Sequence, residues 1–118
     1  MSRLLAGALC ISLVVAAVTA RAHSLLVESA PSAGASVQAP PHLMLRFNNR
    51  IEKGLSRLRL VDGAGVAYPL TVAVGEGDID RLTAGLPSLA PGPYRVEWQV
   101  LSADGHVVGG RFTFTVVP

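Results

Sequence analysis

The sequence has few residues that bind soft metal ions or form covalent cross-links. Its 118 residues include one cysteine, Cys10, and two methionines, Met1 and Met44. Cys10 lies in an apolar N-terminal segment and follows Leu9, where a lipoprotein signal would need a small residue. A single cysteine excludes intramolecular disulfide bonds and thiolate metal clusters. The stability of this chain must therefore come from a hydrophobic core.

The chain also has little net charge. Ten Lys and Arg face eight Asp and Glu, which gives a formal net charge of +2 at pH 7. Arg3 and Arg21 belong to the N-terminal segment, so residues 23–118 carry eight charges of each sign. Such a balance gives no electrostatic basis for binding nucleic acid or an anionic membrane. Ser-His-Asp arrangements, phosphate-binding loops and paired carboxylates are absent as well, so no enzyme class is indicated.

The first 22 residues have the pattern of a secretory signal peptide. A short positive region at 1–3 precedes an apolar region at 4–18, and Ala20 and Ala22 occupy the small-residue positions of an A-x-A cleavage site. The apolar region is shorter than the roughly 20 residues that span a bilayer, which favours a cleaved signal over an uncleaved anchor. We expect export to the periplasm and cleavage after Ala22, leaving residues 23–118 as one small domain.

Residues 23–118 lack helical periodicity and contain many short stretches in which apolar and polar residues alternate. The clear stretches are 42–47, 56–61, 94–100 and 111–117, and weaker ones are 25–29, 66–74 and 78–86. Gly- and Pro-rich turns separate them. About seven short strands with regular turn signals favour an all-β fold, an antiparallel, immunoglobulin-like (cupredoxin-like) β-sandwich or barrel with Greek-key connections.

Three histidines are candidates for chemistry: His23, His42 and His106. His42 lies on the polar side of its strand pattern and is interpreted as a solvated strand residue. His106 lies in "SADGHVVGG", two residues after Asp104, and an Asp-x-His loop that bends at Gly105 can direct both side chains to one point. A purely structural interpretation stays open, because Asp-Gly is a common turn dipeptide.

Cleavage after Ala22 would give His23 a free α-amine next to its imidazole. An ordinary α-amine has a pKa of about 7.7–8.0 and loses its proton readily to a metal. The amine and the imidazole Nδ1 of His23 can then chelate one ion, while His106 adds a nitrogen and Asp104 an oxygen. Such a donor set suits Cu(II), whereas Zn(II) prefers tetrahedral thiolate or imidazole sites and Cu(I) prefers sulfur. We therefore expect a Cu(II) site at His23, Asp104 and His106.

The sequence resembles the CopC family of periplasmic copper-binding proteins and the related YobA-type proteins. The resemblance is carried by "AHSLLVESAPSAG" at 22–34, "LMLRFNNRIEKGLSRLRLVD" at 43–62 and, above all, "LAPGPYRVEWQVLSADGHVVGGRFTFTV" at 89–116. It implies a seven-stranded β-sandwich that binds Cu(II) at its N-terminal histidine. Carried over, the ligands are the amine and imidazole of His23, the Asp104 carboxylate and His106, with Trp98 near the metal. It also implies copper sequestration, copper resistance or delivery to a CopD-type inner-membrane copper transporter.

Two departures from the family pattern stand out. Many members have an acidic residue where "FNNRIE" places Asn49, so a carboxylate ligand or supporting group is missing there. The segment "YPLTVAVGEGD" at 68–78 has no Met or His, so a second site for Cu(I) is not expected. The strand pattern by itself favours a core role for Trp98, while the resemblance permits both.

Two other functions stay open from the sequence. A metal-free immunoglobulin-like interaction module would show no preference for Cu(II). A copper monooxygenase would use the same N-terminal histidine chelate, but Asp104 would occupy the coordination position that dioxygen needs. We expect a non-enzymatic, soluble and monomeric copper-binding domain.

Overall fold

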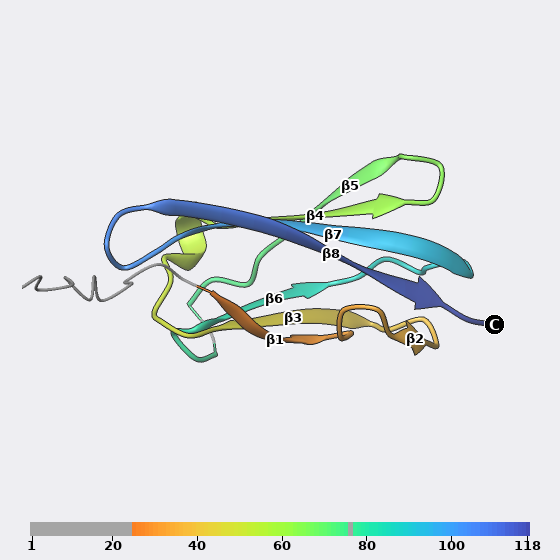
Figure 1. Cartoon of the computed structure of the whole chain (residues 1–118), viewed down its shortest axis with the longest axis horizontal. Coiled ribbons are helices and arrows are strands. Elements are labelled where there is room, and N and C mark those ends of the chain that lie inside the picture. Colours follow the sequence, from red (N-terminus) through yellow and green to blue (C-terminus); the bar gives the residue numbers. More distant parts are fainter. Residues whose placement is uncertain (1–24, 76) are drawn as a thin grey trace, which may run out of the picture.

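Two β-sheets pack face to face in the computed structural model, which describes residues 25–75 and 77–118 (Figure 1). The smaller sheet has three strands in the order β1-β3-β6. Its members are β1 (Leu26–Ala30), β3 (His42–Phe47) and β6 (Arg81–Gly85), paired antiparallel. The expected signal peptide and His23 lie outside the described residues.

The larger sheet has five strands in the order β2-β8-β7-β4-β5. Its members are β2 (Ser36–Val37), β4 (Arg57–Asp62), β5 (Ala67–Leu70), β7 (Gly92–Leu101) and β8 (Val107–Val116). β4 pairs with β7 although β5 and β6 come between them in the chain, a non-local pairing typical of Greek-key sandwiches. One turn of 3-10 helix, η1 (Lys53–Leu55), lies in the connection from β3 to β4. No helix among the described residues has the length and apolarity needed to cross a membrane.

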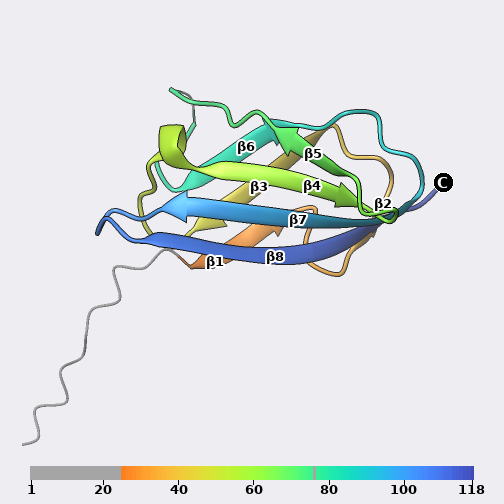
Figure 2. The ribbon, with the colours of Figure 1, turned by 90° about the horizontal axis from the view of Figure 1, so that it is seen from above.

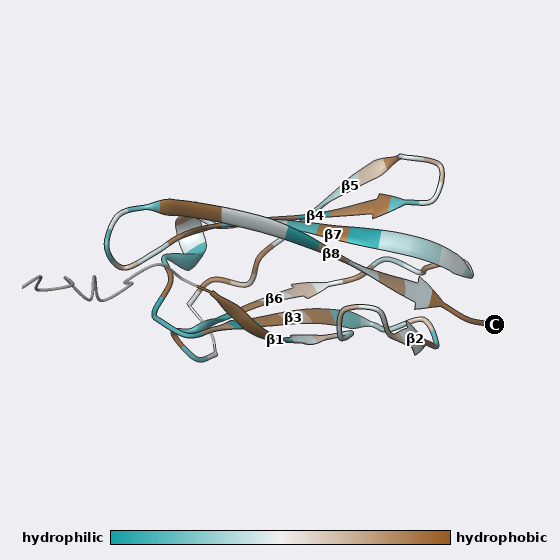
Figure 3. Ribbon diagram, in the orientation of Figure 1, coloured by the Kyte–Doolittle hydropathy of each residue, from teal (hydrophilic) through white to brown (hydrophobic). Residues whose placement is uncertain are grey.

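The core fills the space between the two sheets and follows the alternation expected from the sequence. Figure 3 shows hydrophobic residues in the strands of both sheets and polar residues in many of the connecting loops. Leu43, Leu45 and Phe47 of β3 have no exposed surface, while Val96 and Val100 face them from β7. Fully burying such a side chain stabilises a fold by about 1.5–3 kcal/mol, so these alternating positions determine which face of each strand turns inward.

The expected all-β sandwich is confirmed, with one addition to the strand set. The two-residue strand β2 makes an eighth strand, and it pairs with β8 in parallel rather than antiparallel. The Thr115 N–H donates to the Ala35 carbonyl at 2.9 Å, and the Val117 N–H donates to the Val37 carbonyl at 2.8 Å. This segment lies between Pro-containing stretches and shows no alternation, because a strand of two residues is too short to have a period.

The stretch expected as one strand at 66–74 is divided between the two sheets. Residues 67–70 form β5 at the edge of the larger sheet, whereas Val72 forms a bridge to Ala84 of β6 in the smaller one. The Ala73 N–H also donates to the Thr83 carbonyl at 2.9 Å. This segment therefore closes one open side of the sandwich, a role that its local pattern does not reveal.

Candidate metal centre

The turn between β7 and β8 carries two of the predicted ligands. Gly105 has φ +83°, in the left-handed region that favours glycine, and its N–H donates to the Ser102 carbonyl at 3.0 Å. The Ser102 N–H donates to the His106 carbonyl at 2.8 Å, and the Ser102 hydroxyl donates to the same oxygen at 3.2 Å. Ser102 is only 1% exposed, so the turn is fixed to the body of the sandwich.

The side chains of Asp104 and His106 meet, as the Asp-x-His spacing predicted. Asp104 Oδ2 lies 2.9 Å from His106 Nδ1, and Asp104 Oδ1 accepts the His106 backbone N–H at 3.1 Å. The hydrogen bond from the His106 side chain, assisted by the His106 backbone N–H and by Ser102, lowers the pKa of Asp104 to about 2. Asp104 is thus ionised at neutral pH. The purely structural interpretation of the Asp-Gly turn and the convergence of the Asp104 and His106 side chains do not exclude each other, because the structure shows both.

This contact determines which donor atoms the pair can offer. A proton on His106 Nδ1 is directed at the Asp104 carboxylate, which places the lone pair of the neutral ring on Nε2. The His106 side chain is 66% exposed and that of Asp104 is 21% exposed. A carboxylate oxygen has two lone pairs, so Asp104 can orient the imidazole and retain capacity for a cation. The turn offers one nitrogen and one carboxylate at a single accessible point.

Asn48 is a site residue that the sequence pattern did not single out. It follows the last residue of β3, where the alternation ends, and its Oδ1 accepts the Leu25 N–H at 2.7 Å. Its own N–H donates to the Leu25 carbonyl at 3.0 Å. The neighbouring Asn49, which marks the family's acidic position, is half-buried. The Asn-Asn pair directly after a predicted strand could have indicated this role, because asparagine side chains often form hydrogen bonds with backbone groups.

The start of the described chain and the Asp104–His106 turn lie at the same end of the sandwich. Figures 1 and 2 both show β1 beginning, and β3 and β7 ending, at the end where the β7–β8 turn projects. A bridge between Ile51 and Ser102 and a hydrogen bond from the Glu52 N–H to the Leu101 carbonyl at 3.0 Å join these segments. His42 lies at the other end of β3 and is exposed, in agreement with its interpretation as a solvated residue.

The third predicted ligand, His23, lies outside the described residues. Among residues 25–75 and 77–118, no three or more His, Cys, Asp or Glu side chains gather closely enough to hold a metal ion. Asp104 and His106 are two of the three predicted ligands, and the described residues bring these two together.

Trp98 is half-buried and packs inside the sandwich near this end. Its ring meets that of Phe47 edge to face, with centroids 5.2 Å apart at 69°. The indole lies directly over Gly110, where a Cβ atom would come within 2.5 Å of Trp98 Cζ2. This explains why a glycine occurs in the middle of β8. Trp98 thus packs against the hydrophobic core, as the alternation favoured. Its position near a metal remains a prediction.

Comparison with known proteins shows similarity to a single protein family over nearly the whole β-sandwich. The model of the CopC domain family matches residues 26–117. Protein YobA of Escherichia coli strain K12 is 38% identical over 114 residues, 89% of this chain and 86% of that protein. Copper resistance protein C of Escherichia coli is 33% identical over 108 residues, 85% of this chain and 86% of that protein.

Two further similarities concern a larger protein and a solved structure. Copper transport protein CutJ of Bacillus subtilis strain 168 is 28% identical over 101 residues, which are 83% of this chain and 19% of that protein. The crystal structure of CopC from Methylosinus trichosporium OB3b superimposes with a TM-score of 0.72 at 38% identity, covering 81% of this chain and 95% of that one. The resemblance in the sequence and the arrangement of the two sheets are thereby confirmed: the chain belongs to the CopC family.

Proposed function

We propose that this chain is a periplasmic Cu(II)-binding protein that acts in copper sequestration, resistance or delivery. The observation that carries the proposal is the Asp104–His106 pair, held 2.9 Å apart at the end of the sandwich where β1 begins. Membership of the CopC family and the copper-related names of two relatives support it. The predicted export signal at residues 1–22 supports a periplasmic location.

The proposed ligands are the α-amine and imidazole of His23, the Asp104 carboxylate and the imidazole of His106. Asn48 fixes Leu25 at the end of the sandwich that carries the Asp104–His106 turn. Leu25 is two residues after His23 in the sequence. The proposal requires a donor close to Leu25, and two residues of extended chain reach at most about 7 Å. Residues 1–22 would direct export of the domain, and their removal would create the amine ligand.

Copper(II) is favoured over other ions by the chemistry of these donors. Three nitrogens and one carboxylate suit Cu(II), which also stands highest in the affinity order of the divalent first-row metals. Cu(I) prefers sulfur, and Met44 is the single sulfur-containing residue in 23–118. Met44 pairs with Thr83 in the middle of β3 and lines a separate hollow with Asp78 and Arg81. The proposed site thus has nitrogen and oxygen donors and no sulfur.

A membrane copper transporter of the CopD type is the proposed recipient. The similar segment of CutJ is a minor part of a larger protein that is named a copper transport protein. A domain that is fused to a transport protein in one organism can act on a similar transport protein as a separate chain in another organism. This supports a role in transfer rather than in chemical conversion of a substrate.

The test compares two forms of the chain with different amino termini. One form is exported with its own signal and begins at His23, and the other has one extra residue between Ala22 and His23. We expect the extension to weaken Cu(II) binding greatly and to lower the number of nitrogen couplings in the electron paramagnetic resonance spectrum. Equal affinities and spectra would show that the amine is not a ligand. A failure of both forms to prefer Cu(II) over Zn(II) would favour the metal-free interaction module.

A further inference from the structure

The outer face of the five-stranded sheet carries a concentration of arginines. Arg57 and Arg59 project from β4, Arg95 from β7 and Arg111 from β8, on the side opposite the core. The strand register places Arg59 opposite Glu97 and Glu97 opposite Arg111. Glu97 is the one acidic residue of these three strands on this side, so the face has three positive charges in excess among the described residues.

Glu97 cannot neutralise this face. Its Oε2 accepts a hydrogen bond from Arg59 at 2.6 Å, and its Oε1 is held by Arg95 at 3.0 Å. Within the described ranges, no acidic side chain lies within ion-pair distance of Arg57 or Arg111. Three acidic residues elsewhere pair with local cations, in the pairs Glu28–Arg46, Glu52–Arg50 and Asp78–Arg81. The balanced charge of the domain is thus unevenly distributed over its surface.

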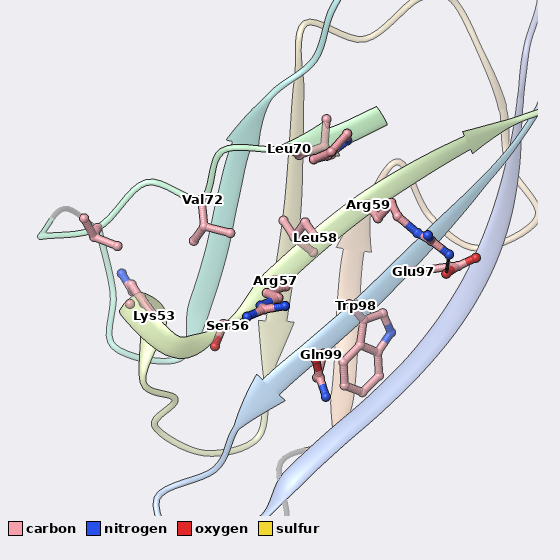
Figure 4. Close-up of a pocket in the computed structure, with 13 residues that line it drawn as sticks. Lys53, Ser56, Arg57, Leu58, Arg59, Leu70, Val72, Glu97, Trp98 and Gln99 are labelled. Atoms are coloured by element: carbon pink, nitrogen blue, oxygen red, sulfur yellow. Dashed lines mark hydrogen bonds and ion pairs between the residues drawn. The ribbon is translucent and has the colours of Figure 1, made fainter. Parts of the chain in front are cut away.

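A groove with apolar walls borders this arginine face. It has a volume of about 630 Å³ and lies along β4, with Arg57 and Arg59 at its border. Leu70, Val72 and Val74 provide apolar lining from the segment that leaves β5. In Figure 4, Leu70 and Val72 lie to one side of β4, and the Arg59–Glu97 pair lies to the other. Neither Asp104 nor His106 lines this groove.

We propose that this face binds an acidic, partly apolar segment of a partner protein. Arginine guanidinium groups match carboxylates with two parallel hydrogen bonds, so Arg57 and Arg111, which Glu97 does not engage, can each hold an acidic side chain. The groove beside them accepts apolar side chains of the same segment. A lipid bilayer fits less well. Its flat surface of headgroups would contact the arginines and would leave the concave, apolar groove unfilled. The Asp104–His106 turn stays accessible at the end of the sandwich.

The probe is a short acetylated peptide in which glutamates alternate with leucines. Trp98 is the single tryptophan and lines the groove, so its fluorescence reports occupancy in the metal-free, exported chain. We expect saturable binding that weakens as NaCl is raised, because salt screens exposed charges. A peptide with lysines in place of the glutamates should not bind. Equal binding of the two peptides, or binding of vesicles with anionic lipid in place of the acidic peptide, would overturn the proposal.

Two variants connect the binding to the arginine face. Arg57→Glu should weaken binding of the acidic peptide at least about tenfold, as expected for reversal of a contacting charge. The matched control is Arg50→Glu, an exposed arginine in the connection between β3 and η1, which should bind like the unmodified chain. Thermal unfolding verifies that each variant folds, and Arg57→Gln replaces the reversal if it does not. Equal losses in the Arg57 and Arg50 variants would contradict a specific face.

Discussion

Asn48 binds both backbone polar groups of Leu25. The Asn48 side-chain oxygen accepts the Leu25 N–H at 2.7 Å, and the Asn48 N–H donates to the Leu25 carbonyl at 3.0 Å. The end of β3 therefore holds the chain just before β1, two residues after His23. If His23 is a copper ligand, this contact pre-organises it. Pre-organisation of this kind reduces the entropy lost on binding.

Replacement of Asn48 by alanine should weaken Cu(II) binding more than it destabilises the fold. The lost side-chain hydrogen bond is exposed and should cost about 0.5–1.5 kcal/mol in the free energy of unfolding. Cu(II) affinity, measured by competition titration, should fall about tenfold because His23 is less restricted. Gln38→Ala, which removes an exposed amide directly after β2, is the control and should leave the affinity nearly unchanged. An unchanged affinity in the Asn48 variant would show that the contact with Leu25 does not influence the site.

Substitution of Asp104 by asparagine separates the turn from the metal site. Asparagine keeps an oxygen that can accept the His106 backbone N–H but removes the negative charge that faces the ring. We expect a nearly normal thermal unfolding midpoint and a 10- to 100-fold lower Cu(II) affinity, roughly the effect of removing a ligand or the partner of a ligating histidine. Asp78→Asn, in the connection from β5 to β6, is the control. Wild-type affinity in the Asp104 variant would leave the residue with a role in the turn alone.

A methyl group at position 110 should disturb Trp98. The Cβ of Gly110→Ala would lie 2.5 Å from Trp98 Cζ2, so the ring or the strand must shift. Overpacking of this kind costs about 1–3 kcal/mol, and the tryptophan emission should move to longer wavelength as the ring becomes more exposed. Gly85→Ala in β6 is the control, since a Cβ there meets no atom within 4 Å. Chemical denaturation and fluorescence of both variants test the prediction, which fails if they behave alike.

Asp62 should make the stability of the domain depend on pH under acidic conditions. The backbone N–H of Val66, together with Tyr68 and the N–H of Ala64, lowers the pKa of Asp62 below its usual value of 3.8. Because the folded pKa is the lower one, this stabilisation is fully present above the unfolded pKa and is lost as pH falls through the folded pKa. Asp62→Asn should therefore be less stable than the parent at pH 7, with a difference that shrinks below about pH 4.

Thermal unfolding of the parent and the Asp62→Asn variant across this pH range provides the measurement. Asparagine retains an oxygen for the Ala64 and Val66 N–H groups, so the β4–β5 turn is preserved and the effect of charge is isolated. A stability difference that stays constant down to pH 2 would contradict the assigned role of the charge.

Much of the fold was predictable because it depends on local pattern. The alternation in 42–47, 94–100 and 111–117 correctly identified the inward residues of β3, β7 and β8, since burial of apolar side chains selects one face of a strand. The Asp104–His106 pair was predictable for a similar reason. Both residues lie in one short turn, and the positive φ of Gly105 brings their side chains together without help from distant segments.

Contacts between distant segments were decided only by the tertiary structure. Leu25 and Asn48, and likewise β2 and β8, meet because segments from separate parts of the chain become neighbours. The arginine face has the same origin, since Arg59 and Arg111 lie on strands that each pair with β7. A sequence specifies which face of a strand is apolar and the total charge of the chain. The order and register of the strands determine which side chains share a surface, and that depends on packing of the whole sandwich.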